Sequence, residues 1–247
     1  EDGQTIDTDI IRDIAADNIG ALIWSKSMEM NDMEKPDFLK NAMRNLSIPV
    51  ITMEKYGFDC PGVDILFDYE KGGYMATRHL IECGHRRIGC VAGKQSFHVT
   101  MQRLNGYKKA LEESGISYDP DLVYFGDYTM ESGYEAFSYI LGQKVTAIFS
   151  MNDEMAFGIY RAARLYGVSI PEDISIIGFD NVPFADVMQV PLTTIGVPVI
   201  EMGKKLGEKV VDLIDNKEKL KEREEILYTP RLLVRGSTKS IPPVTVI

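Results

Sequence analysis

Cysteine, histidine and long apolar runs are scarce in this chain, and each scarcity excludes a class of protein. The three cysteines (Cys60, Cys83 and Cys90) form no CxxC pair, so we expect a reduced, cytoplasmic protein. The three histidines lack metal-ligand spacing such as HxxxH, so neither a metal nor a cofactor is expected. No apolar run reaches the ~20 residues of a membrane span, so we expect no membrane partner. No signal peptide opens the chain, but it begins at Glu1 without an initiator methionine, so that observation carries little weight.

Positive charge is also in short supply. The 247 residues contain 27 Lys and Arg against 37 Asp and Glu, which gives a net charge of −10. A protein that grips a phosphate backbone needs clustered Lys and Arg, so this chain alone is not expected to bind nucleic acid. The hydrophobic content of 45% is ordinary for a soluble globular protein, and the length suits one large domain or two lobes of about 100–150 residues.

The apolar residues are arranged as alternating strand and helix segments. The clearest strand is 174–179, a continuous apolar run that predicts a strand buried on both faces of a parallel sheet. The alternation predicts an α/β fold. A strand and a long helix after residue 191 come too late for a single sheet, so we expect two lobes with the chain crossing between them. Further strands are predicted near 19–24, 48–53, 63–67, 87–91, 122–125, 147–150, 192–197, 226–228 and 232–234, and helices near 6–17, 36–46, 72–83, 100–114, 130–141, 153–166 and 199–213.

Two charged residues are the leading candidates for a binding site. Asp180 ends the 174–179 strand, and in open α/β sheets ligands bind outside the carboxyl ends of the strands. Its two oxygens could accept hydrogen bonds from adjacent sugar hydroxyls, or it could cap a helix over 182–188. Arg103 stands in a predicted first helical turn, where the helix dipole disfavours a cation, so it needs a partner. That partner could be a ligand diol, Asp180 itself, or Glu112 in a surface ion pair.

Six other residues are weaker candidates. Asn152 offers a donor and an acceptor to a hydroxyl, or caps the helix that follows it. Tyr128 could stack on the apolar face of a pyranose or be partly buried in the wall of its lobe. Phe97 could cover the site or anchor its loop. The remaining candidates follow two strands of the first lobe: Trp24, Ser25 and Asp68.

The sequence contains no complete catalytic motif. The segment Gly89–Lys94 resembles a phosphate loop, but it has three residues between its glycines instead of four. No GxGxxG fingerprint occurs, and Ser150 lacks the GxSxG context of a hydrolase nucleophile. An α/β enzyme with Asp180 or Asp153 as general base would lack a nucleophile, a cofactor loop and a metal set. We therefore expect a binding protein and not an enzyme.

Six segments, in order and with matching spacing, resemble the LacI/GalR family of bacterial transcription regulators. They are Gly84–Ile88 (GHRRI), Arg103–Leu111 (RLNGYKKAL), Asn152–Ala156 (NDEMA), Pro171–Asp180 (PEDISIIGFD), Pro191–Ile195 (PLTTI) and Val234–Thr238 (VRGST). Each segment alone is weak evidence, but six in register from about residue 1 to 238 are strong. The resemblance implies a repressor and assigns the matching Arg103 to effector contact.

The resemblance also implies an architecture and partners. The fold would be periplasmic-binding-protein-like type I: two doubly wound parallel-sheet lobes joined by three crossovers near Gly84, Thr194 and Lys221. The first lobe would comprise 1–84 plus 195–221, and the second 85–194 plus 222–247. The family binds a small-molecule effector between the lobes; here we expect a sugar or sugar derivative, with a purine as second choice, and a homodimer.

Two parts of the family pattern have no counterpart in these residues. The helix-turn-helix domain and hinge helix through which the family contacts DNA are not in the chain. The first β-α-β of the core also lacks a match, so we expect a first lobe truncated at its start. The alternative function is a solute-binding protein of a sugar transporter, which shares the fold class; a signal peptide in the full gene would favour it.

Overall fold

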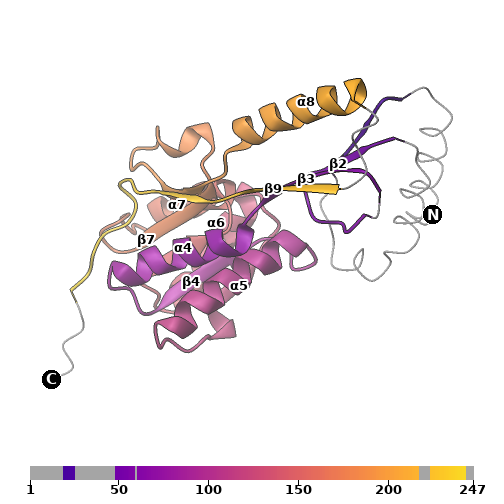
Figure 1. The fold of residues 1–247 in the computed structure, drawn as a ribbon. Coiled ribbons are helices and arrows are strands. Elements are labelled where there is room, and N and C mark those ends of the chain that lie inside the picture. The colour runs from indigo at the N-terminus through magenta and orange to yellow at the C-terminus, as the bar shows by residue number, and fades with distance from the viewer. Residues whose placement is uncertain (1–18, 26–47, 59, 217–222, 243–247) are drawn as a thin grey trace, which may run out of the picture. The chain divides into compact units, whose positions relative to one another are not determined.

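The computed structural model describes residues 19–25, 48–58, 60–216 and 223–242 (Figure 1). The helices predicted over 6–17 and 36–46, and the crossover predicted near Lys221, lie outside these residues. The chain divides into two compact units: unit 1 is Glu1–Phe67 with Pro198–Tyr228, and unit 2 is Asp68–Val197 with Thr229–Ile247. It therefore passes three times from one unit to the other.

Unit 1 is built on a four-stranded parallel sheet in the order β1-β2-β3-β9. The strands are β1 (Leu22–Trp24), β2 (Val50–Thr52), β3 (Gly62–Phe67) and β9 (Arg223–Tyr228). All of β2 and nearly all of β3 are buried, as is typical of the inner strands of a parallel sheet. The helix α8 (Val199–Asp215) is amphipathic and buries Met202 and Leu213.

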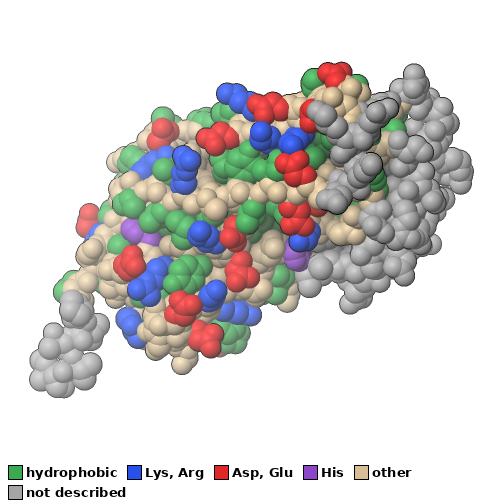
Figure 2. Space-filling view, viewed as in Figure 1, with side chains coloured by type: hydrophobic (Ala, Val, Ile, Leu, Met, Phe, Trp, Pro, Cys, Tyr) green, Lys and Arg blue, Asp and Glu red, His purple; other side chains and the backbone are tan. Residues whose placement is uncertain are grey.

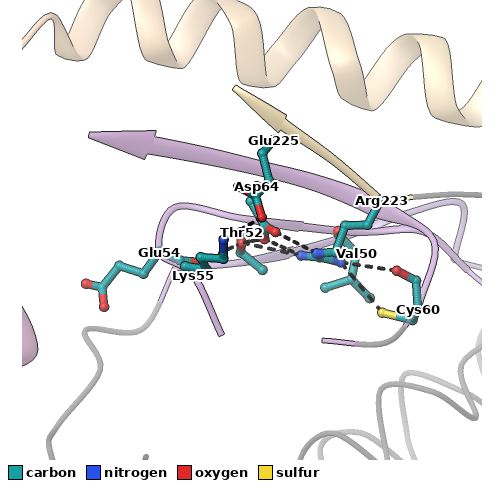
Figure 3. A network of polar contacts seen from close by, with 8 residues as sticks. All are labelled: Val50, Thr52, Glu54, Lys55, Cys60, Asp64, Arg223 and Glu225. Carbon is teal, nitrogen blue, oxygen red and sulfur yellow. Dashed lines mark hydrogen bonds and ion pairs between the residues drawn. The ribbon is translucent and has the colours of Figure 1, made fainter. Parts of the chain in front are cut away.

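A buried ion pair joins the two strands at one edge of this sheet (Figure 3). Arg223, the first residue of β9, donates from Nε to Asp64 Oδ2 at 2.8 Å and from Nη2 to Asp64 Oδ1 at 2.6 Å. Thr52 of β2 also donates its hydroxyl to Asp64. The Arg223 Nη1 group donates to the carbonyl oxygens of Val50 and Cys60, each at 3.3 Å. The buried Asp64 carboxylate and the largely covered Arg223 guanidinium thus both have partners, which is the condition for keeping such charges inside a fold.

Unit 2 contains a six-stranded sheet in the order β10-β8-β7-β6-β4-β5. Every pair is parallel except β10 with β8. All side chains of β4 and β6 are buried, and all of β7 except Asp180. The strands are β4 (Ile88–Ala92), β5 (Val123–Phe125), β6 (Ala147–Ser150), β7 (Ser175–Asp180), β8 (Thr193–Gly196) and β10 (Arg231–Leu233).

Four helices pack against the sheet of unit 2 in two pairs, α4 with α5 and α6 with α7 (Figure 1). Neighbouring residues of β7 separate the two faces: Phe179 lies against Gly72 of α4, and Gly178 lies against Asp153 of α7. The two parallel sheets, with helices on both faces of the sheet of unit 2, confirm the predicted α/β fold class. The helices are α4 (Tyr69–Glu82), α5 (His98–Glu113), α6 (Met130–Gly142) and α7 (Asp153–Leu165), with short 3-10 turns at η1 (Pro120–Leu122) and η2 (Pro183–Ala185).

The helix pairs approach backbone to backbone at glycines. A Cβ on Gly73 of α4 would lie 2.2 Å from the Arg103 carbonyl oxygen of α5. A Cβ on Gly158 of α7 would lie 1.9 Å from the Met130 carbonyl oxygen of α6. Any larger residue would separate the helices, so these glycines allow the close approach of the two helices in each pair.

The boundaries between the units differ from those expected for the lobes. Helix α4 falls in unit 2 and not in the first lobe, because it packs along α5. Strand β9 falls in unit 1 and not in the second lobe, because it pairs with β3 along its whole length. The passage expected at Thr194 occurs after Val197. Every helix within the described residues is too short or too polar to traverse a lipid bilayer.

Candidate ligand-binding site

Arg103 and Asp180 form an ion pair at the carboxyl ends of the unit 2 strands. The Arg103 Nη2 atom lies 3.3 Å from Asp180 Oδ1, and Arg103 Nη1 donates to the Met151 carbonyl oxygen after β6. The Arg103 side chain is 7% exposed and the Asp180 side chain 33% exposed. The alternative role of each residue is wrong. The N-cap residue of the turn η2 is Val182, with no side-chain hydrogen bond, so Asp180 does not cap it. Arg103 pairs with Asp180 and not with Glu112. Because α5 begins at His98, Arg103 also stands in the second turn.

Three aromatic rings surround the Arg103 guanidinium. Its Cζ atom lies 3.9 Å from the ring centre of Phe179, 5.0 Å from that of Tyr69 and 5.7 Å from that of Tyr128. Such cation–π contacts stabilise a guanidinium that has been removed from water. The Arg103 Nε–H group is buried and finds no acceptor among the described residues, so a donor is left for a further partner.

Tyr128 and Phe97 form a half-buried aromatic pair beside Arg103. Their ring centres lie 6.3 Å apart with a 23° angle between the planes, and the Tyr128 hydroxyl lies 2.6 Å from Thr100 Oγ1. The backbone of Tyr128 has φ 73°, and its ring occupies the space that a side chain on Gly93 would need. Phe97 is the N-cap residue of α5 and lies against the Tyr128 ring, and its covering of a binding site stays a prediction.

Asn152 and Asp68 use their side chains as helix caps. Asn152 Oδ1 accepts from Met155 N at 2.9 Å, which is the capping alternative, and its Nδ2 donates to the Tyr128 carbonyl oxygen at 2.9 Å. Asp68 accepts from Lys71 N at 2.9 Å at the start of α4. Asn152 thereby connects the end of β6 to the Tyr128 loop, while a ligand-binding role for either residue stays a prediction.

Trp24 and Ser25 lie at the end of β1 in unit 1. Trp24 is half-buried and packs edge-on against Tyr56, with ring centres 6.4 Å apart, and Ser25 is exposed. Their part in a binding site also stays a prediction. In unit 2 the structure brings Arg103, Asp180, Tyr128 and Phe97 into one cluster.

Sequence reasoning considered Asp153 only as the general base of an enzyme and missed its place as a buried carboxylate behind this cluster. Asp153, the first residue of α7, has no exposed surface; Oδ1 accepts from Thr194 Oγ1 at 2.6 Å and Oδ2 from Val182 N at 2.9 Å. Burial raises the pKa of Asp153 to about 6, against the lowering effect of these hydrogen bonds. Burial likewise raises the pKa of Asp180, and Arg103 opposes that rise. The sequence signal that could have pointed to Asp153 is Gly178, a glycine within an otherwise apolar strand, where a side chain would overlap the carboxylate.

These groups suit the binding of a polar ligand. The cluster offers a carboxylate, a guanidinium and ring faces, but no nucleophile with an adjacent base. Among the described residues, no three His, Cys, Asp or Glu side chains are placed to hold a metal ion. A doubly wound α/β unit with convergent polar groups at the carboxyl ends of its strands defines a ligand-binding domain of the periplasmic-binding-protein-like class.

Comparison with known proteins supports this class. A profile of the periplasmic binding protein-like domain matches residues 77–238. The HTH-type transcriptional repressor PurR of Photobacterium profundum is 36% identical over 208 residues, which cover 83% of this chain and 61% of that repressor. The cellobiose complex of the transcriptional regulator CelR superposes with a TM-score of 0.79 at 29% identity, over 96% of this chain and 71% of CelR.

A LacI family regulator from Enterococcus faecium with bound ribose superposes with a TM-score of 0.72 at 25% identity, over 90% of this chain and all of that one. The chain belongs to the LacI/GalR family of transcription regulators. It spans 61% of the length of the Photobacterium repressor. These relatives are named as regulators and repressors, which favours a regulator over an enzyme or a transporter protein.

Proposed function

We propose that this chain is the effector-binding and dimerisation core of a LacI/GalR-type transcription regulator. The observation that carries the proposal is the partly exposed Arg103–Asp180 pair among the rings of Phe179, Tyr69 and Tyr128. A carboxylate accepts from neighbouring hydroxyls, a guanidinium donates to hydroxyl oxygens, and ring faces cover the C–H face of a sugar. The proposed effector is therefore a sugar or sugar derivative, and a purine, which could stack on the same rings, is second.

Related regulators support a sugar, since their structures contain cellobiose and ribose. In our proposal the effector binds between two lobes, and their closure changes the affinity for DNA. Such coupling requires that the effector bind the two lobe arrangements with different affinity. DNA contact would reside in a helix-turn-helix domain that these 247 residues do not include. The visible face of the described residues agrees with this, because acidic and basic side chains are interspersed on it (Figure 2).

The proposed homodimer has support on the surface of unit 2. Phe184 and Val187, in and after η2, are 69% and 70% exposed. Phe184 borders a hollow of about 790 Å³ that is also lined by Phe157, Tyr160 and Met188. A projecting apolar ring beside an apolar hollow on the same face suits a two-fold contact, in which each copy fills the hollow of the other.

Titration calorimetry tests the proposed effector site. The purified chain is titrated with monosaccharides, disaccharides and nucleobases, and the ligand that binds is then titrated into Asp180→Ala. We expect binding to be lost in this variant and retained in Asp186→Ala, which removes an exposed carboxylate six residues further along. Unchanged affinity in Asp180→Ala would remove Asp180 from the site. Failure of the whole panel to bind the wild type would refute both proposed effector classes.

A further inference from the structure

We propose that Asp153 is a positioning residue for the effector site: its buried carboxylate holds the turn after β7 in the conformation that presents Asp180 to Arg103. This inference rests on the proposed function of Asp180 and Arg103. Asp153 itself touches neither Arg103 nor, in the proposal, the effector. Its action is on the backbone that carries Asp180.

The carboxylate of Asp153 joins three segments of unit 2. Its own helix, α7, follows β6; Oδ1 accepts from Thr194 of β8, and Oδ2 accepts from the Val182 N–H, two residues after the end of β7. The backbone N–H of Asn181 also faces the carboxylate. One side chain thus fixes the last part of β7 from behind, on the face opposite to Phe179 and Arg103.

The turn needs such support because its backbone is strained. Asp180 has φ 108° and Asn181 has φ 59°, two consecutive non-glycine residues in the left-handed region. Conformations of this kind persist only where the surroundings impose them, and they gather at functional sites. Arg235 holds the Asn181 side chain at 2.7 Å, whereas the hydrogen bond from Val182 to Asp153 holds the backbone itself.

Gly178 shows that the strand is shaped around this carboxylate. A Cβ at position 178 would lie 2.2 Å from Asp153 Oδ1 and 2.9 Å from Leu192 Cδ2. The φ of Gly178 is not in the left-handed region, so glycine is needed here for lack of room for a side chain and not for its backbone conformation. Gly178→Ala should therefore displace the carboxylate while its charge and its helix stay in place.

The protonation state of Asp153 should matter for the turn. The carboxylate accepts on both oxygens. A proton on Oδ2 would oppose the Val182 N–H, which can only donate, whereas the Thr194 hydroxyl can also accept. Two titratable groups interact with the Asp153 carboxylate: Asp180 of β7 and Tyr160 of α7. A third, Arg103 of α5, partly neutralises Asp180. From β8 the Asp153 carboxylate meets the uncharged Thr194 hydroxyl. Its pKa of about 6 puts the change within reach of an ordinary pH titration.

The test compares Asp153→Asn and Gly178→Ala with Glu154→Gln, which removes an exposed carboxylate from the same helical turn. Cellobiose, ribose and adenine are the probes. For the probe that binds, we expect affinity to weaken by on the order of tenfold in both test variants, and not in Glu154→Gln. The wild-type affinity should also fall with a midpoint near pH 6, and this acid limb should disappear in Asp153→Asn. A purely structural role would not remove the acid limb.

Amide hydrogen exchange gives a second readout that needs no ligand. The Val182 amide should exchange roughly tenfold faster in Asp153→Asn than in Glu154→Gln, because it has lost a charge-assisted acceptor. If the wild type binds none of the probes, the proposed effector classes fail, and the exchange rates still decide the role of Asp153. The inference would be overturned if Asp153→Asn had the same affinity, the same pH profile and the same Val182 exchange rate as the wild type.

Discussion

Replacing Arg223 by methionine should strongly destabilise unit 1. The substitution keeps most of the aliphatic stem but leaves the Asp64 carboxylate without the two guanidinium donors at 2.6 and 2.8 Å. Removing one partner of a buried pair costs about 3–5 kcal/mol, because the remaining charge is uncompensated. The Asp64 side chain is 3% exposed, so water cannot replace the lost donors without opening the sheet.

Replacing both partners should cost much less. In Asp64→Leu with Arg223→Met no charge remains buried, and apolar substitutes for a buried pair are often neutral. The Thr52 hydroxyl and the carbonyl oxygens of Val50 and Cys60 each lose one hydrogen bond, so we expect a residual loss of about 1–2 kcal/mol. The double variant should therefore be more stable than Arg223→Met, which a double-mutant cycle would show as a favourable coupling energy.

Urea unfolding followed by tryptophan fluorescence suits this test. Trp24 is the only tryptophan in the chain and lies in unit 1, so its emission reports that unit even if the two units unfold separately. The control is the Lys55–Glu225 ion pair at 2.8 Å on the same sheet, whose side chains are 62% and 49% exposed (Figure 3). Glu225→Gln should cost less than about 1 kcal/mol. If Arg223→Met cost no more than Glu225→Gln, the argument from burial would be refuted.

Three further predictions concern unit 2. Gly158→Ala should destabilise the chain by about 2 kcal/mol or more in urea unfolding, because the new Cβ would overlap the Met130 carbonyl. The folded pKa of Asp153, about 6, lies above its ordinary 3.8, so the folded state binds the proton more tightly than the unfolded state. The unfolding free energy of the wild type should therefore rise relative to Asp153→Asn as the pH falls from 7 to 4, by at most about 3 kcal/mol. Phe184→Asp should shift the chain from dimer to monomer in analytical ultracentrifugation, without changing effector affinity; a variant that stays dimeric would locate the contact elsewhere.

The strands of both sheets could be predicted within a few residues because of how parallel sheets are buried. A strand covered on both faces is apolar at most of its positions, so segments such as 174–179 stand out without any partner being known. The start of α4 was placed three residues late for a related reason. Gly72 and Gly73 are poor helix formers and suggested a beginning, but they lie inside the helix, where Phe179 and α5 leave no room for a side chain.

Some charged pairs could be predicted from the sequence around each residue, and others could not. Asp180 could be proposed because it ends a buried strand at the edge where ligands bind, and Arg103 because a cation near a helix N-terminus needs a partner, although the structure places it in the second turn. The Arg223–Asp64 pair could not, because it depends on β9 lying beside β3, 159 residues away in sequence. The same holds for Asp153, because its partners Thr194 and Val182 come from two other segments of the chain. The one trace of this contact in the sequence is Gly178, where a side chain would overlap the Asp153 carboxylate.

The hydrogen-bonding capacity that the fold leaves unused separates the candidate residues better than their position does. Asn152 has committed its oxygen to the Met155 N–H and its amide to the Tyr128 carbonyl, and Asp68 caps α4. By contrast, Asp180 gives one oxygen to Arg103 at a long 3.3 Å and keeps a third of its side chain exposed, and Arg103 keeps a buried Nε–H without an acceptor among the described residues. A ligand gains most where it completes such partial bonding, since a group left unsatisfied in a buried site costs free energy that a well-placed hydroxyl removes. Effector recognition in unit 2 should therefore centre on Arg103 and Asp180, with Asn152 acting through the loop that it holds.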